Sequence, residues 1–346
     1  MLAAFDASAA GTPPLRVPDE SAPHERTFMQ WPVNRQVHDD ADFLRDLQGA
    51  IARIANAIVA FEPVTMLMAE RYRREAGRRL SGKVEIWDIP TDDLWCRDSG
   101  PLFGFDAGGR PVVSHIRFNG WGGKQQHGDD GRIAAAVAQR LGIPVVDHGL
   151  IGEAGGAETD GAGTVLAHES SWINPNRNAG DKADVTRRLL AAYGAEKVLW
   201  APGLRGADIT DYHIDALARF TRPGAVLIQL PDEIDPADPW SRATFRTHDI
   251  LAAATDAAGR RLKLEVIPEP VRPRVTSGDF VASYVNYYVC NGAVIAAQFG
   301  DRETDGLARK ALARHFPGRE IVMLDVDALG EAGGGIHCAT QQQPRG

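Results

Sequence analysis

Segments whose apolar residues follow the spacing of one helix face alternate along this chain with short apolar runs. The first such segment begins behind an aspartate that can cap a helix, and two later ones stop at Gly142 and Gly194, where glycine favours a helix end. The pattern predicts helices over residues 39–61, 70–80, 131–142, 182–194, 242–259 and 306–316.

The short apolar runs predict buried strands between these helices. A longer segment, 280–300, predicts a pair of strands that turn at Asn291–Gly292, a dipeptide favoured in tight hairpins. The other strands are predicted over residues 64–69, 83–89, 111–119, 197–202, 225–231, 263–268 and 320–326. Because strands and helices alternate throughout, the sequence predicts an α/β fold.

The length and composition are typical of a globular protein. Its 346 residues can form one large domain or two ordinary ones, and no shift in composition marks a linker. Residues 1–19 have neither the basic start nor the apolar centre of a signal peptide, so we expect a loose N-terminal arm followed by one domain over 20–346. No apolar stretch reaches the length of about 18 residues that spans a bilayer, and we expect a cytoplasmic protein without a membrane segment.

Charge and cysteine usage narrow the chemistry further. The net charge of −8 argues against a nucleic-acid partner, which needs a basic surface, and is compatible with a small cationic substrate. The three cysteines fit no disulfide framework and form no CxxC pair, so a zinc site is not expected. The sequence also has neither the GxGxxG nor the GxxxxGK[ST] loop of nucleotide-binding proteins, so we expect no nucleotide cofactor.

Polar residues gather in loops that follow the predicted strands. DDLWCRDSGP (92–101) contains Trp95 and Asp98, and GEAGGAETDGAGT (152–164) contains Glu153. Carboxylates only accept hydrogen bonds when ionised, so a pair of them suits a planar cation with several N–H donors, such as guanidinium. The indole of Trp95 offers a face to a cation or an aliphatic stem. The alternatives are that Asp98 pairs with Arg97 and that Trp95 is a core residue.

TDYHID (210–215) places His213 two residues before Asp215. If this segment is extended, both side chains face the same side, and the carboxylate favours the protonated imidazole. A surface histidine beside a surface aspartate is the alternative interpretation.

GGGIHCATQQQP (333–344) places Cys338 behind three glycines, which would let the backbone pass close to a planar substrate. His337 and Cys338 are neighbours and would point to opposite faces of an extended chain. His337 is therefore interpreted as a bystander, and His213 is the better partner for the thiol. The alternative for Cys338 is a small buried apolar residue.

Together these segments resemble the agmatine deiminase family, which groups with bacterial-type peptidyl-arginine deiminases in the guanidino-group-modifying pentein superfamily. The resemblance covers roughly residues 20–344. It rests on EPVTMLM, WCRDSGP, FNGWGGK, GGAETDGAGT, NPNRN, TDYHID, SYVNYYVCNG with QFGD, and GGGIHCATQQQP.

The resemblance implies a pentein fold of five ββαβ-like units around a pseudo-fivefold axis, with the site at the centre. It implies hydrolysis of a guanidino compound to a ureido product and ammonia, as in polyamine biosynthesis, where agmatine gives N-carbamoylputrescine. No metal or organic cofactor is implied, and a homo-oligomer is compatible with the family. The implied roles are Cys338 as nucleophile, His213 as general acid/base, Asp98 and Asp215 as ligands of the guanidinium, Glu153 as support for His213, and Trp95 as a wall along the substrate.

Three positions depart from the family pattern. The family's Glu-Gly-Gly reads Glu153-Ala154-Gly155, and its Glu-Thr-Asp-Gly-His reads Ile209-Thr210-Asp211-Tyr212-His213. One carboxylate is lost and one glycine becomes tyrosine, which would change how the far end of the substrate is held. Free-arginine and peptidyl-arginine deiminases, an amidinotransferase of the same fold and a non-enzymatic cation-binding pentein are the alternative functions.

Overall fold

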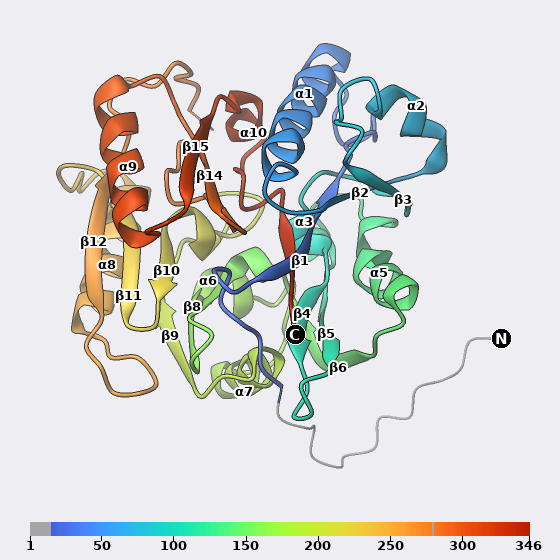
Figure 1. The fold of residues 1–346 in the computed structure, drawn as a ribbon. Helices are drawn as coiled ribbons and strands as arrows, with labels where there is room; N and C mark the ends of the chain where they lie inside the picture. Colours follow the sequence, from blue (N-terminus) through green and yellow to red (C-terminus); the bar gives the residue numbers. More distant parts are fainter. Residues whose placement is uncertain (1–14, 279) are drawn as a thin grey trace.

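The computed structural model describes residues 15–278 and 280–346, which form five small sheets around a common centre (Figure 1). One sheet has four strands, in the order β16-β1-β2-β3, and the other four sheets have three strands each. The strands are β1 His24–Gln30, β2 Val64–Met68, β3 Glu85–Asp88, β4 Leu102–Phe105, β5 Pro111–Arg117, β6 Val145–Ile151, β7 Ala157–Thr159, β8 Thr164–His168, β9 Lys197–Ala201, β10 Ala218–Arg222, β11 Ala225–Leu230, β12 Lys263–Pro268, β13 Tyr288–Cys290, β14 Ala293–Ala297, β15 Glu320–Leu324 and β16 Gln341–Pro344.

Each sheet repeats one unit: two antiparallel strands, a helix, and a third strand parallel to the second. In the unit that begins with β4, for example, β4 pairs antiparallel with β5, and β6 returns parallel to β5. The long helices lie on the outside of the ring (Figure 1). They are α1 Ala41–Ile58, α5 Ile133–Leu141, α7 Lys182–Tyr193, α8 Pro239–Ala253 and α9 Arg302–His315.

The two ends of the described chain close the ring. β16, the last strand, pairs antiparallel with β1, and β1 pairs parallel with β2 beyond α1. The first unit is therefore completed by the C-terminal strand, and β3 is an additional strand at its edge. This arrangement brings the turn before β16, which holds Cys338, into the middle of the molecule.

The local signals for helix ends are confirmed. Asp40 caps α1, because its carboxylate accepts from the backbone N–H groups of Asp42 and Phe43. α5 and α7 end at Gly142 and Gly194, both in the left-handed conformation. Glycine is required at position 194 for two reasons: the backbone is left-handed, and a Cβ there would overlap the carbonyl oxygen of Leu15.

Several predicted bounds were wrong. The helix over 70–80 is a 3-10 turn at Glu70–Tyr72 and a single helical turn, α2, at Arg73–Ala76. Within 280–300 the turn at Asn291–Gly292 is confirmed, but only β13 and β14 are strands. α8 and α9 each begin three or four residues earlier than predicted, behind the capping residues Asp238 and Asp301. The sequence pattern missed β1, β4, β6, β7, β8, β10 and β16.

The predicted arm over 1–19 lies largely outside the described residues, but its last part is packed. Leu15 and Val17 are buried, and the backbone of Arg16 pairs with that of Phe105 in an isolated antiparallel β-bridge. Residues 15–19 are therefore not loose. The start of the catalytic domain at residue 20 stays a prediction.

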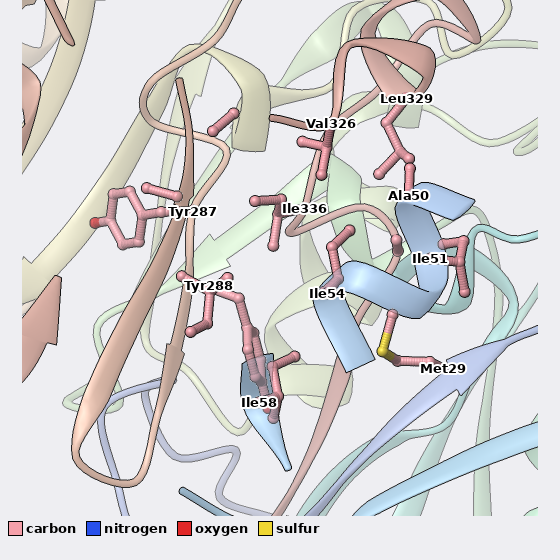
Figure 2. Close-up of a cluster of buried hydrophobic side chains, with 14 of the residues drawn as sticks. Met29, Ala50, Ile51, Ile54, Ile58, Tyr287, Tyr288, Val326, Leu329 and Ile336 are labelled. Carbon is pink, nitrogen blue, oxygen red and sulfur yellow. The ribbon is translucent and has the colours of Figure 1, made fainter. Parts of the chain in front are cut away.

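The largest core cluster lies between α1 and the sheet of β13, β14 and β15. Ile54 and Ile58 of α1 face Tyr288 and Ile336 (Figure 2). All four side chains are fully buried. Because Ile336 lies two residues before Cys338, this packing anchors the loop that carries the thiol.

No helix in the described part of the chain is long and apolar enough to cross a membrane.

Candidate active site

Four loops at the centre of the ring bring the predicted site residues together. Asp98 lies in the short helix α3 (Cys96–Ser99), Glu153 precedes a 3-10 turn at Ala154–Gly156, and His213 precedes another at Ile214–Ala216. Gly155 marks the point of convergence. A methyl group there would lie 2.5 Å from Asp98 Oδ1, 3.1 Å from His213 Nδ1 and 3.2 Å from Asp215 Oδ2.

His213 is buried between two carboxylates. Its Nε2 lies 3.2 Å from Glu153 Oε2, and its Nδ1 lies 3.6 Å from Asp98 Oδ1. Burial lowers the pKa of the imidazole, but Asp98, Glu153 and Asp215 outweigh burial and raise the pKa to about 9. His213 is therefore an imidazolium at neutral pH.

Glu153 is itself fixed by Arg177, whose Nε donates to both carboxylate oxygens at 2.9 and 3.0 Å. The Nη1 of Arg177 also donates to Asp211 at 2.7 Å. This buried network holds the partner of His213 in one orientation.

Asp98 and Asp215 each use one oxygen within the protein and present the other. Asp98 Oδ2 accepts from the indole N–H of Trp121 at 2.9 Å, and Asp215 Oδ2 lies 2.7 Å from His337 Nδ1. Oδ1 of each carboxylate is buried and has no hydrogen-bond partner among the described residues. Buried acceptors without partners are costly, so both oxygens point to a missing donor group.

The two carboxylates differ in their pKa. Burial raises the pKa of Asp98 to about 6, although His213 acts in the opposite direction. Burial would also raise the pKa of Asp215, but the hydrogen bond and charge of His337 lower it below its ordinary value.

Cys338 lies beside Asp215 and is held by Asn286. Its Sγ is 3.5 Å from Asp215 Oδ2 and accepts from Asn286 Nδ2 at 3.1 Å. The Oδ1 of Asn286 accepts from the backbone N–H groups of His337 and Cys338. Burial, followed by the charges of Asp215 and Asp98, raises the pKa of the thiol well above its ordinary value.

The glycines before Cys338 make room for side chains of the site. A Cβ on Gly334 would lie 2.6 Å from the ring of Trp95, and one on Gly335 would lie 2.5 Å from Asn286 Oδ1. Trp95 is buried against this loop and belongs to the largest core cluster, and its role along a substrate stays a prediction. Passage of the glycine backbone along a substrate stays a prediction.

Two sequence interpretations are corrected by the geometry. His337 is not a bystander, because it bonds directly to Asp215. The TDYHID segment is not extended: Asp211 and Tyr212 have φ of 61° and 71°, and a 3-10 turn follows. His213 and Asp215 still converge, through the turn instead of through strand alternation.

Sequence reasoning assigned no role to Asn286, Trp121 or Arg177, although each lies within a motif quoted above. The signal that could have marked Asn286 and Trp121 is a polar group inside an otherwise apolar or glycine-rich run. Trp121 also has a positive φ of 54°, an uncommon conformation for a bulky residue that sequence does not reveal.

Ile209 is partly exposed, and its carbonyl oxygen accepts from Lys124 Nζ at 3.0 Å. The same ammonium group bonds Asp211 at 2.7 Å. The position at which the family pattern has a carboxylate therefore carries an apolar side chain beside a lysine.

No group of three or more His, Cys, Asp or Glu side chains within residues 15–278 and 280–346 is arranged to hold a metal ion.

Comparison with known proteins agrees with this architecture. A relative from Streptomyces coelicolor, which carries a provisional agmatine deiminase name, is 37% identical over 96% of this chain and 99% of its own. The agmatine deiminase of Medicago truncatula is 34% identical over 95% of this chain and 96% of its own. The solved structure of the agmatine deiminase of Enterococcus faecalis superposes with a TM-score of 0.88 at 28% identity, covering 97% of this chain and 98% of the other.

The ring of five units with its central polar site is the pentein fold. The sequence profile of the Porphyromonas-type peptidyl-arginine deiminase family matches residues 16–344. The chain belongs to that family, and the resemblance drawn from its motifs is confirmed.

Proposed function

We propose that this protein is a cysteine-dependent deiminase that hydrolyses a guanidino compound, agmatine or a related arginine derivative, to a ureido product and ammonia. With agmatine the product is N-carbamoylputrescine. The observation that carries the proposal is the pair of buried oxygens on Asp98 and Asp215 that accept no hydrogen bond from the described residues, beside a cysteine and a histidine that faces two carboxylates. The names of the relatives support the same reaction.

The Oδ1 atoms of Asp98 and Asp215 bind the guanidinium group. Guanidinium presents several N–H donors in one plane, and each carboxylate accepts from one edge of that plane. Trp95 packs along the substrate stem. The cation completes a site that, when empty, leaves two acceptors unsatisfied.

Binding of this cation also prepares the nucleophile. In the empty site Asp98 and Asp215 raise the pKa of the Cys338 thiol. A guanidinium between them offsets their charge and favours the thiolate, so the thiol loses its proton to water when substrate is bound.

In the first half-reaction the thiolate attacks the guanidinium carbon. The C–N bond to one terminal nitrogen then breaks, and the imidazolium of His213 donates a proton to the departing ammonia. The product of this step is an amidino-thioether on Cys338. A histidine whose pKa is raised to about 9 is suited to this role, because it holds its proton at neutral pH.

In the second half-reaction the neutral imidazole of His213 takes a proton from water, which attacks the same carbon. The C–S bond breaks, the hydroxyl proton of the adduct passes to solvent, the ureido product leaves, and the thiolate and imidazolium are restored. Glu153, fixed by Arg177, holds the ring of His213 in place through both steps.

A panel of guanidines tests the proposal. Purified protein is incubated with agmatine, arginine, a peptidyl-arginine and short guanidino acids, and ammonia and ureido product are measured. At least one compound should give both in equal amounts. Folded protein that releases neither from any of them would contradict the proposal.

Substitution of the nucleophile gives the matched control. Cys338→Ser should lower turnover by at least about 1,000-fold, because a serine hydroxyl is a much weaker nucleophile than a thiolate at neutral pH. Cys290→Ser, at a buried thiol outside the site, should keep turnover. Undiminished activity of Cys338→Ser would remove the assigned nucleophile.

An amidinotransferase would pass the amidino group to an amine in place of water. Glycine and other amines added to the reaction therefore separate the two functions. A deiminase gives ureido product at an unchanged rate, whereas a transferase gives a new guanidine. A cytoplasmic location, a homo-oligomer and the absence of a nucleic-acid partner stay predictions.

A further inference from the structure

The ring of His337 lies between two buried carboxylates behind the site. Its Nδ1 is 2.7 Å from Asp215 Oδ2, and its Nε2 is 2.9 Å from Glu20 Oε2. Ionised carboxylates only accept, so both contacts are hydrogen bonds when both ring nitrogens carry a proton. The three side chains therefore form a continuous chain from carboxylate to imidazole to carboxylate.

We propose that Glu20 and His337 are positioning residues for the reaction, which hold Asp215 ionised and oriented so that its second oxygen faces the guanidinium. The inference rests on the proposed function of the site. Neither residue would touch the substrate, since each acts through Asp215.

The orientation follows from how Asp215 is tied. Its Oδ2 is held by His337, while Oδ1 is buried without a partner in the described residues. Asp98 is tied in the same way, but its donor is the neutral indole of Trp121. At Asp98, burial and the charges of Glu153 and Asp215 raise the pKa, and the bond from Trp121 does not offset them. At Asp215, burial also raises the pKa, but the hydrogen bond and charge of His337, together with His213 and Arg219, outweigh it and lower the pKa.

Glu20 is fixed as firmly as Asp215. Its carboxylate accepts from Arg97 Nη2 at 2.8 Å and from the backbone N–H of Val289 at 2.8 Å, and lies 3.1 Å from Arg219 Nη2. Burial raises the pKa of Glu20, but Arg219, His337 and Arg97 together lower it well below its ordinary value. We call the chain of Glu20, His337 and Asp215 the relay. Its outer carboxylate, Glu20, is thus held in the ionised form and belongs to the segment that precedes β1.

The titration of Asp215 depends on all ionisable groups around His337 and Asp215, which come from seven segments. Glu158 of β7 lies 3.6 Å from His337 Nε2 and 2.9 Å from Arg219 Nε. The ionisable or charged groups that face His337 or Asp215 in the described part of the chain are Glu20, Arg97, Asp98, Glu158, Tyr193, His213, Arg219 and Cys338. His337 itself bonds both Glu20 and Asp215.

The test measures the ionisation of Asp215 directly. Aspartate carboxyl carbons are labelled with ¹³C, the resonance of Asp215 is identified by its loss in Asp215→Asn, and pH titrations are recorded by NMR. His337→Gln should raise the pKa of Asp215 by about one unit or more, because it removes the side chain that does most to lower this pKa. Glu20→Gln, which leaves His337 in place, should raise it by less, and serves if His337→Gln does not fold.

His315→Gln is the matched control. His315 also bonds a carboxylate through Nε2, to Glu265 at 2.8 Å, but lies in α9 away from the site. It should leave the titration of Asp215 unchanged. Turnover supplies a second readout. As the pH is lowered, kcat/KM of His337→Gln should fall more steeply than kcat/KM of the wild type. In His315→Gln, kcat/KM should fall with the same slope as in the wild type.

An unchanged Asp215 titration in both His337→Gln and Glu20→Gln would overturn the relay, whatever happens to turnover. If the titration shifts but the wild type turns over no guanidine, the proposed function fails and the link between His337 and Asp215 stands. A loss of stability alone, with wild-type titration and wild-type acid slope, would make His337 a purely structural residue and would also overturn the proposal.

Discussion

Gly155 leaves no space for a side chain at the centre of the site. Its φ is not in the left-handed region, so alanine fits its backbone, and only the space is missing. The atoms in the way are Asp98 Oδ1, His213 Nδ1 and Asp215 Oδ2. A single methyl group must therefore displace the groups that the chemistry uses.

Gly155→Ala should lower kcat/KM by about 100-fold or more, since displacements of 1 Å in a catalytic site have costs of that order. Thermal unfolding should change little by comparison. Gly306→Ala is the control, because it lies in α9 with open space at its Cβ and should be slightly stabilising and fully active. An active Gly155→Ala would mean that the three side chains do not converge in solution.

The raised pKa of Asp98 predicts how binding depends on pH. Asp98 has a pKa of about 6 in the empty site, and only its ionised form attracts a guanidinium. The affinity is therefore fully present above that pH and is lost as the pH falls through it, by about tenfold per unit.

Calorimetric titration of Cys338→Ser with the best substrate of the panel, between pH 7 and pH 5, measures this loss without turnover. The same protein carrying Asp98→Asn should bind weakly and with less dependence on pH. An affinity that stays constant down to pH 5 would show that Asp98 does not bind the guanidinium group.

Sequence alone identified Cys338, His213, Asp98, Asp215 and Glu153 as site candidates because each lies in a short polar segment with unusual neighbours. Their supports come from distant segments: Trp121 acts through one hydrogen bond to Asp98, and Asn286 acts through three hydrogen bonds to His337 and Cys338. No local pattern encodes such a bond, and the role of His337 was missed because strand alternation was applied to a turn.

At the scale of elements, the loop before His213 is strained. Tyr212 has a φ of 71°, a conformation that costs a non-glycine residue about 1–2 kcal/mol. The ring compensates by packing against His168 and Trp240, with centroids 4.6 Å away in each case, and its hydroxyl lies 2.9 Å from Thr244 Oγ1. A buried aromatic side chain contributes about 3–5 kcal/mol, so packing outweighs strain.

Tyr212→Gly should therefore lower the free energy of unfolding by about 2 kcal/mol, the difference between those two effects. Urea denaturation measures it. Tyr212→Phe, which loses only the hydroxyl bond, should cost about 1 kcal/mol. A Tyr212→Gly variant more stable than the wild type would reverse the ranking of packing and strain.

β1 shows one physical reason why a strand can be missed in the sequence. β1 reads HERTFMQ, and its Thr27 and Gln30 are fully buried although polar. Thr27 Oγ1 lies 2.9 Å from Tyr288 Oη, and Gln30 Nε2 donates to the backbone of Asp93. β1 satisfies buried polar groups, so its sequence lacks the continuous apolar run that predicted strands such as β11.

At the scale of the whole molecule, α/β alternation was readable from the sequence, whereas the fivefold repeat was not. The units share an arrangement of strands and helix, but their connecting loops differ in length and hold different parts of the site. Only the family resemblance predicted the ring.

Removal of residues 341–346 tests the closure of the ring. β16 forms four residue pairs with β1, and the loss of their hydrogen bonds should destabilise the protein by on the order of 4 kcal/mol. Thermal unfolding should occur at a lower temperature, and turnover should be lost because the Cys338 turn is no longer held from its C-terminal side. The single substitution Arg345→Ala, which removes only an exposed pair with Glu25, should change neither.

Because β16 pairs with β1, the ring could form equally well if the chain began in another of its units. The backbone N–H of Arg345 bonds the carbonyl of Pro23, so the last residues of the chain and the segment before β1 run side by side. A short linker between residues 346 and 15, with new ends in the exposed loop over 232–237, would give the same five units in a different order of synthesis. In such a permuted protein the cysteine would leave the ribosome well before the histidine that serves it.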